Sequence, residues 1–204
     1  MTQPTDRMAQ LPEIGDVDKE EGEFWVANPL MIPEMGENLS AYERNKLFVN
    51  VDGKKFIDGS FASSTDIDSD SRSVVACDID RDGAQDLLVA SAGGGALRVF
   101  SNQLEQNNRV EIWLKGVKSN RQGIGSRITA HCGDKQFVRD LFPANGFMGM
   151  GPAVAWMGVG DAEKIDKLTI RWPTGEVQEL SGVGVNQSVR ITEDSDKVET
   201  LRRW

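Results

Sequence analysis

Hydrophobic and polar residues alternate with a period of two along much of this chain. Residues 110–114 read V-E-I-W-L, and residues 168–172 read L-T-I-R-W. Alternation of this kind is typical of β-strands that bury one face and expose the other. Residues 173–176 supply turn chemistry before Val177-Gln178-Glu179-Leu180, which reads as the next strand. Val189 and Ile191 repeat the pattern and predict a last strand before an acidic tail. The second half of the chain is therefore expected to be β-rich.

The first half of the chain also has the residue pattern of β-strands, with stronger turn signals between them. Residues 47–51 and 54–57 read as two strands around the Asp52-Gly53 hairpin turn. Residues 73–77, 86–90 and 96–100 predict three more strands. A capping-box pattern at Ser40 to Glu43 predicts one short helix. The predicted fold class is all-β with little helix.

Composition narrows the classes of partner. The chain has 204 residues, 21 glycines and a net charge of −9. An acidic surface repels nucleic-acid phosphates and anionic membranes, so we expect no nucleic-acid partner. No stretch reaches the roughly 20 apolar residues of a transmembrane segment. A single histidine, His131, argues against histidine-based triads and His-rich zinc sites.

The two cysteines, Cys77 and Cys132, form no CxxC motif. We interpret them as two buried thiols, although one disulfide is compatible with their number. The first residues lack the apolar core of a secretory signal, so this part of the sequence does not identify the cellular compartment of the protein.

The N-terminal region reads as an extension over residues 1–45. Its first part is acidic and too poor in apolar residues to form a core. An apolar cluster follows and is our candidate for a partner-docking arm; its residues are Phe24, Trp25, Leu30, Met31 and Ile32. The same cluster could equally strap across the protein's own core.

The strongest chemical signal is an aspartate-rich loop over residues 78–87. The predicted ligands of a metal ion are Asp78, Asp80, Asp82, Asp86 and the backbone carbonyl of Ala84. Hard Ca²⁺ takes six to eight oxygen ligands, and acids at positions 1, 3 and 5 of a tight turn supply several. Position 12 is Val89 and the flanks are strands, so the loop is not an EF-hand. Calcium is the expected cofactor.

A second acidic run, Asp66, Asp68 and Asp70, has no glycine after it. We interpret it as a solvated loop, with assistance to the first site as the alternative. The segment 119–125 could hold an anion on its backbone amides, or its Asn120 and Arg121 could brace the loop.

Two stretches of the sequence resemble known families. The pattern of residues 78–87, followed by a valine-rich strand and glycines, resembles the FG-GAP or VCBS repeat, which builds propeller blades and carries calcium in this loop. Residues 116–127, 157–162 and 170–175, with Asn186, resemble the ASPIC/UnbV domain, found after such repeats in cartilage acidic protein and bacterial relatives.

The resemblance implies one blade-like unit at 46–108, an ASPIC/UnbV-like and β-sandwich-like domain at 109–194, and a tail at 195–204. It also favours an extracytoplasmic location. One blade would leave two sheet edges that the rest of the chain or another protein must cover.

These observations favour a non-catalytic, calcium-binding interaction module, an accessory subunit that binds another protein or a larger assembly. The first alternative is a metal-dependent hydrolase, which the acidic cluster would serve. No nucleophile–base pair can be named, so we expect no enzyme. The second alternative is a carbohydrate-binding protein that uses calcium and Trp25, Trp113 or Trp204.

Overall fold

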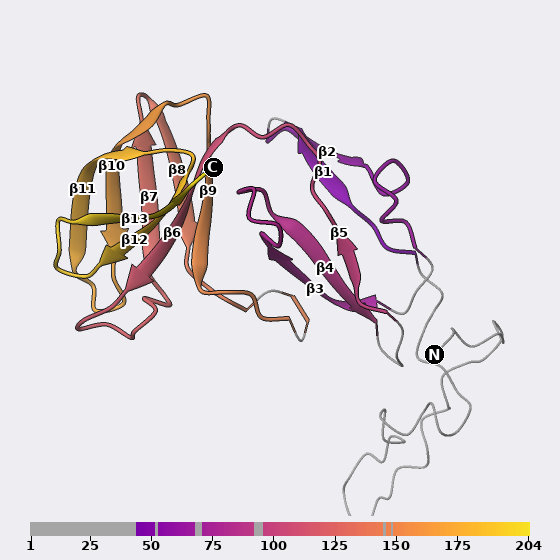
Figure 1. Cartoon of the computed structure of the whole chain (residues 1–204), viewed down its shortest axis with the longest axis horizontal. Helices are drawn as coiled ribbons and strands as arrows, with labels where there is room; N and C mark the ends of the chain where they lie inside the picture. Colours follow the sequence, from indigo (N-terminus) through magenta and orange to yellow (C-terminus); the bar gives the residue numbers. More distant parts are fainter. Residues whose placement is uncertain (1–43, 52, 68–70, 92–95, 145, 148) are drawn as a thin grey trace, which may run out of the picture. The chain divides into compact units, whose positions relative to one another are not determined.

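A computed structural model describes residues 44–51, 53–67, 71–91, 96–144, 146–147 and 149–204. Thirteen strands and no helix occur within these residues, which confirms the all-β class (Figure 1). No helix that could span a membrane is present in the same residues. The chain divides into two compact units. The first comprises Met1–Ser73 with Val89–Arg98, and the second comprises Val74–Leu88 with Val99–Trp204.

Five strands lie in the first half of the chain. A two-stranded antiparallel hairpin joins β1 (Phe48–Val51) to β2 (Lys55–Asp58). A three-stranded sheet has the order β3 (Ser71–Cys77), β4 (Asp86–Ser91) and β5 (Arg98–Phe100). Gly53 in the hairpin turn has φ +67°, a backbone conformation that glycine adopts at little cost.

Two four-stranded sheets form the larger part of the second unit. One sheet has the order β11-β10-β7-β8, and the other has the order β13-β12-β6-β9. The first is built from β11 (Val177–Gly184), β10 (Lys164–Arg171), β7 (Arg127–Cys132) and β8 (Lys135–Asp140); the second from β13 (Val198–Arg203), β12 (Gln187–Thr192), β6 (Asn108–Lys115) and β9 (Val154–Gly160). Most neighbours are antiparallel, but β6 and β12 run parallel.

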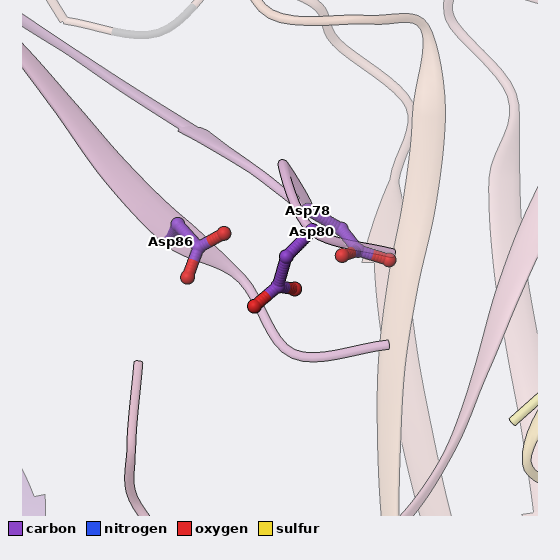
Figure 2. A group of neighbouring side chains, drawn as sticks. All are labelled: Asp78, Asp80 and Asp86. Carbon is purple, nitrogen blue, oxygen red and sulfur yellow. The ribbon is translucent and has the colours of Figure 1, made fainter. Parts of the chain in front are cut away.

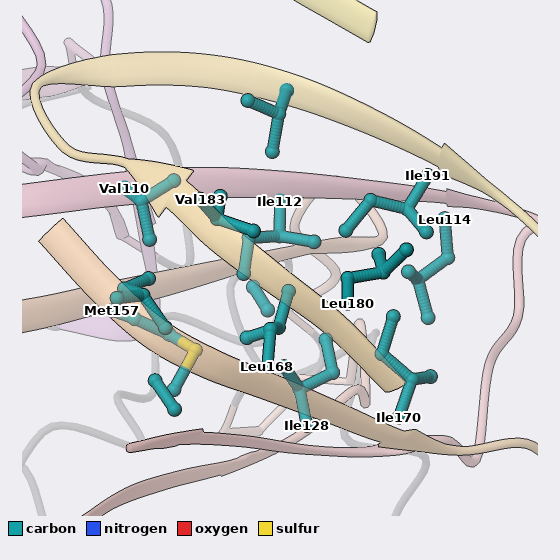
Figure 3. Close-up of a cluster of buried hydrophobic side chains, with 14 of the residues drawn as sticks. Val110, Ile112, Leu114, Ile128, Met157, Leu168, Ile170, Leu180, Val183 and Ile191 are labelled. Carbon is teal, nitrogen blue, oxygen red and sulfur yellow. The ribbon is translucent and has the colours of Figure 1, made fainter. Parts of the chain in front are cut away.

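One continuous hydrophobic core lies between these two sheets (Figure 3). Fully buried side chains come from strands of both sheets; among them are Val110, Ile112, Ile128, Leu168, Ile170, Val189 and Ile191. The alternation in 110–114 and 168–172 points its apolar positions into this core, as the pattern predicts. Burying a large aliphatic side chain contributes about 1.5–3 kcal/mol, so this core is the main source of stability.

Several parts of the sequence prediction differ from the structure. Four strands, β7, β8, β9 and β13, have no counterpart in the expected set. Residues 198–203 form β13, paired with β12, where a tail was expected over 195–204. Polar residues dominate β13, and its order comes from the ladder with β12 rather than from its own burial. The short helix expected at Ser40 lies outside the described residues.

Candidate metal site

The candidate metal site is the loop that joins β3 to β4. Asp78 directly follows β3 and Asp86 begins β4, so the strand ends bring them together. The loop folds back through local hydrogen bonds to its own carboxylates. The Gly83 amide donates to Asp78 Oδ2 at 3.1 Å, and the Ile79 amide donates to Asp86 Oδ2 at 3.0 Å. Gly83 has φ +88°, which agrees with its expected role in the sharp turn.

Three of the four predicted acids converge. One carboxylate oxygen each from Asp78, Asp80 and Asp86 lies within 4.8 Å of the other two (Figure 2). Asp82 is not part of this group, and its Oδ1 accepts the Ala84 amide at 2.7 Å. Ala84 itself is 2% exposed. The structure therefore brings together three of the four acids that the spacing singled out.

Two of the three acids are buried. The Asp78 side chain and the Asp86 residue are each 3% exposed, whereas Asp80 is exposed. Asp86 uses both oxygens inside the protein, since its Oδ1 accepts the Asn102 amide at 2.9 Å. Asp78 Oδ1 is buried and has no hydrogen-bond partner among the described residues. A buried carboxylate oxygen without a partner is costly, and a hard cation is a fitting partner for it.

Arginines from the sandwich brace the loop from outside. Arg109, at the start of β6, donates from Nε to the Gly83 carbonyl at 2.5 Å and from Nη2 to the Asp82 carbonyl at 2.7 Å. Arg202, in β13, lies 3.5 Å from Asp78 Oδ2 and 3.4 Å from Glu111 Oε2. Glu111 is 4% exposed, so Arg202 serves as counterion to two buried carboxylates.

The terminal tryptophan packs on the same loop. The ring of Trp204 lies 5.3 Å from the Arg109 guanidinium and 5.7 Å from that of Arg202. A Cβ added to Gly83 would come within 2.5 Å of this ring, so close approach is a second reason for glycine there. Asn186 holds the arrangement, because its carbonyl accepts the Trp204 amide at 3.1 Å and its Oδ1 accepts the Arg109 amide at 3.3 Å.

Sequence reasoning did not find these bracing residues. Arg202 and Trp204 lie in the segment expected to be a tail, and more than 100 positions separate them from the loop. Glu111 occupies a polar position of an alternating strand, where exposure is the normal expectation, so the sequence carried no signal of its burial.

An anion does lie on backbone amides here, but they belong to residues 117–119 rather than to 119–125, and the anion is internal. Glu193 Oε2 accepts the amides of Val117, Lys118 and Ser119 at 2.6–2.8 Å, and its Oε1 accepts the Ser119 hydroxyl at 2.7 Å. Glu193 is 2% exposed. Burial raises the pKa of this carboxyl, but the hydrogen bonds outweigh that effect and lower the pKa to about 2.

The expected bracing role of Asn120 is present in this segment. Its side chain donates to the Ile124 carbonyl at 2.7 Å and accepts the Ile124 amide at 2.9 Å. Gly116 and Gly123 flank the turn, where an added Cβ would clash with the Asn120 carbonyl oxygen and with the Leu114 side chain, respectively. The motif is thus a structural turn around Glu193, so it offers no open anion site within the described residues.

Some of the other predicted residues lie within the part of the chain that the structure describes, and some lie outside it. Asp66 pairs with Arg44 at 2.7 Å, while Asp68 and Asp70 lie outside the described residues. The candidate docking residues Phe24, Trp25, Leu30, Met31 and Ile32 also lie outside them. Trp113 is half-buried, as is Trp204.

Both cysteines are free thiols. Burial raises the pKa of the Cys77 thiol and of the Cys132 thiol, so neither is activated as a nucleophile.

The family described as ASPIC and UnbV matches residues 116–198 of this chain. The match begins at the turn around Glu193 and continues through β7 to β12. It supports the resemblance seen in the second half of the sequence. The metal loop at 78–86 lies outside it, so the repeat-type likeness of the first half rests on its motif alone. No curated protein matches this chain.

Proposed function

We propose that this protein is a non-catalytic, calcium-binding interaction module that serves as an accessory subunit of a larger assembly. The observation that carries the metal assignment is the Asp78, Asp80 and Asp86 group together with the unpartnered, buried Asp78 Oδ1. Carboxylate oxygens are the donors that Ca²⁺ prefers. Among the described residues no thiol or imidazole joins this group, so a soft or borderline metal would be poorly matched.

The ion would act as a tie between strand ends. Asp78 follows β3 and Asp86 begins β4, so a cation held by both would restrain the loop that separates them. Because the site requires the folded loop, binding adds to the free energy of unfolding. At a calcium concentration of about 100 Kd, this contribution is about 2.7 kcal/mol. The ion therefore supplies rigidity.

The way in which the acids are used supports a role without catalysis. Asp86 accepts two backbone amides, and Asp78 accepts one while facing Arg202. Acids held in this way are poorly placed to exchange protons with a substrate. The two thiols have raised pKa values, which leaves them protonated and weakly nucleophilic. This supports a binding role over hydrolysis.

Exposed aromatic side chains in the first unit support a protein partner. Phe48, Phe56 and Phe61 are 59%, 68% and 89% exposed, and Ile57 is 52% exposed. Apolar side chains gathered on a short hairpin and the turn after it are typical of a surface that another protein covers. The acidic net charge favours a partner with a basic or apolar contact face.

The test of the metal assignment is thermal melting in chelator and in millimolar calcium. We expect calcium to raise the melting temperature of the wild type. Asp80→Asn should abolish the rise, because Asp80 is the exposed member of the group and its loss leaves the buried hydrogen bonds intact. Asp134→Asn, an exposed aspartate in the β7–β8 turn, is the matched control and should keep the rise. A wild type that melts identically in both buffers would remove the metal from this proposal.

A further inference from the structure

A cleft of about 390 Å³ borders the candidate metal loop within the larger unit. Its walls come from the metal loop, from the segment after β5, and from β8 and β9. The volume falls in the range of clefts that hold small ligands. Neither the family match nor the proposed metal accounts for this cleft.

The lining is rich in side-chain amides. Gln85, Asn102, Gln106 and Asn107 all border the cleft. Asn102 and Gln106 use part of their carboxamides on the Leu104 backbone. Within the described part of the chain, the carboxamides of Gln85 and Asn107 make no hydrogen bond, so both remain available to a ligand. An amide offers a donor and an acceptor side by side, which suits a group that also donates and accepts.

The aromatic side chain of Trp156 also lines the cleft. Trp156 of β9 is half-buried, and its backbone carbonyl accepts Arg139 Nε at 3.1 Å. Gly158 is two residues further along the same face of β9. A Cβ added to Gly158 would meet no atom within 4 Å, so the space beside Trp156 is open. A tryptophan combines a large apolar face with an N–H donor, which suits a ligand that is flat and apolar on one side and polar at its rim.

The charges argue against an anionic ligand. Arg109 is committed to the Gly83 and Asp82 carbonyls, and Glu105 borders the same cleft. Among the described residues that line it, Arg139 is then the one further cation, and the chain carries a net charge of −9. A nucleotide or another polyanion would therefore meet one uncommitted arginine and Glu105 in this cleft. A neutral, hydroxyl-rich ligand needs no cationic partner.

We propose that this cleft binds a short saccharide. Vicinal hydroxyls both donate and accept, and so match the amides of Gln85 and Asn107. The apolar C–H face of a pyranose ring would lie on Trp156 over the open floor at Gly158. The inference goes beyond the proposed function, since it names a ligand that the metal tie does not require. Gly83 and Gln85 border the cleft, so the loop forms part of its wall.

The first experiment is binding of the full chain, in calcium, to a panel of immobilised oligosaccharides built from neutral hexoses, N-acetylhexosamines and uronic acids. The saccharide retained best is then measured by titration calorimetry. We expect a measurable Kd for at least one neutral member. A chain that binds no member of the panel overturns the inference.

The decisive variant is Gly158→Leu. Its side chain enters open space, so folding should be preserved while the floor of the cleft is filled. We expect Kd to rise about tenfold or more, equivalent to at least about 1.4 kcal/mol. Gln85→Ala removes a carboxamide without a partner among the described residues and should also weaken binding. Val177→Leu, at a 60%-exposed position of β11, is the control and should leave Kd unchanged.

Unchanged binding in both Gly158→Leu and Gln85→Ala would place the saccharide elsewhere and overturn the assignment of this cleft. The outcome is separate from that of the metal test, because the calcium-dependent melting shift is read without any saccharide. A chain with the melting shift and no saccharide binding keeps the proposed function and loses this inference.

Discussion

The candidate metal loop and the turn around Glu193 both place carboxylates against backbone amides, but they differ in how completely those carboxylates are hydrogen-bonded. In both, buried carboxylates face backbone amides that a glycine-containing turn presents. Glu193 is one acid with four donors, three amides and a hydroxyl. In the loop, three acids share four backbone amides, and no donor from the described residues reaches Asp78 Oδ1.

The difference shows how to separate a structural acid from a ligand. An acid whose oxygens are all satisfied by the chain has no need of an external cation, and its negative charge is already stabilised. Three acids held close together repel one another unless a cation or an arginine lies among them. Arg202 supplies part of that charge at Asp78, but it also faces Glu111. Asp78 Oδ1 is left without a partner among the described residues, and it is there that the proposed divalent ion would bind.

The largest effect should come from Glu193→Gln. The substitution removes the negative charge. It also places the Nε2 group of the glutamine, a hydrogen-bond donor, against the amides and hydroxyl that donate to Glu193. We expect a loss of about 3 kcal/mol in the free energy of unfolding. Urea denaturation should give the same loss in chelator and in calcium. Glu176→Gln, at an exposed ion pair with Lys118, is the control and should cost little. A loss that calcium restores would contradict the structural role of Glu193.

Asp78→Asn should have the next largest effect, and the loss of stability should depend on whether calcium is present. The substitution removes the charge of a ligand whose side chain is buried, so it should lose the calcium-dependent gain of about 2.7 kcal/mol expected at about 100 Kd. Isothermal titration with calcium alone gives the direct readout. Retention of wild-type calcium affinity would show that the ion, if bound, does not use Asp78.

The close contact between Gly83 and Trp204 gives the third prediction. Gly83→Ala adds a Cβ at φ +88° against the tryptophan ring and should cost about 2 kcal/mol. Trp204→Ala removes the obstacle, so the double variant should be more stable than the sum of the single losses predicts. A double-mutant cycle in urea measures the coupling, which should reach about 1 kcal/mol. Strict additivity would mean that the C-terminal residue does not pack on the loop.

The fourth prediction concerns the pH dependence of the Glu193 turn. The pKa of Glu193 is about 2 in the folded chain against an ordinary 4.5, so the folded state favours the carboxylate. Its stabilising contribution is complete above about pH 4.5 and is lost as pH falls toward 2. The wild type should therefore lose its advantage over Glu193→Gln in that window. If the advantage stays constant from about pH 5 to about pH 2.5, the hydrogen bonds to Glu193 do not lower its pKa.

Much of the fold could be predicted from the sequence, because alternation is a local signal. Residues 110–114 and 168–172 show their buried faces directly, and the turn at Gly53 is encoded by two residues. β7, β8 and β9 were missed. β8 is mostly exposed, and β9 has an apolar residue or glycine at every position, so residue type does not alternate cleanly in either strand. β13 was missed because it is held by its partner strand.

By itself, the sequence determined the all-β class, the position of the acidic loop and the need for glycine at 83. These depend on neighbours within about ten positions, where residue type and spacing act directly. Only the tertiary structure decided that Glu193 fills the turn at 117–119, that Arg202 and Trp204 reach the loop, and which acids of the loop meet. The contacts of Glu193, Arg202 and Trp204 join positions more than 70 residues apart. Long-range pairing of this kind follows from sheet order, which no local pattern encodes.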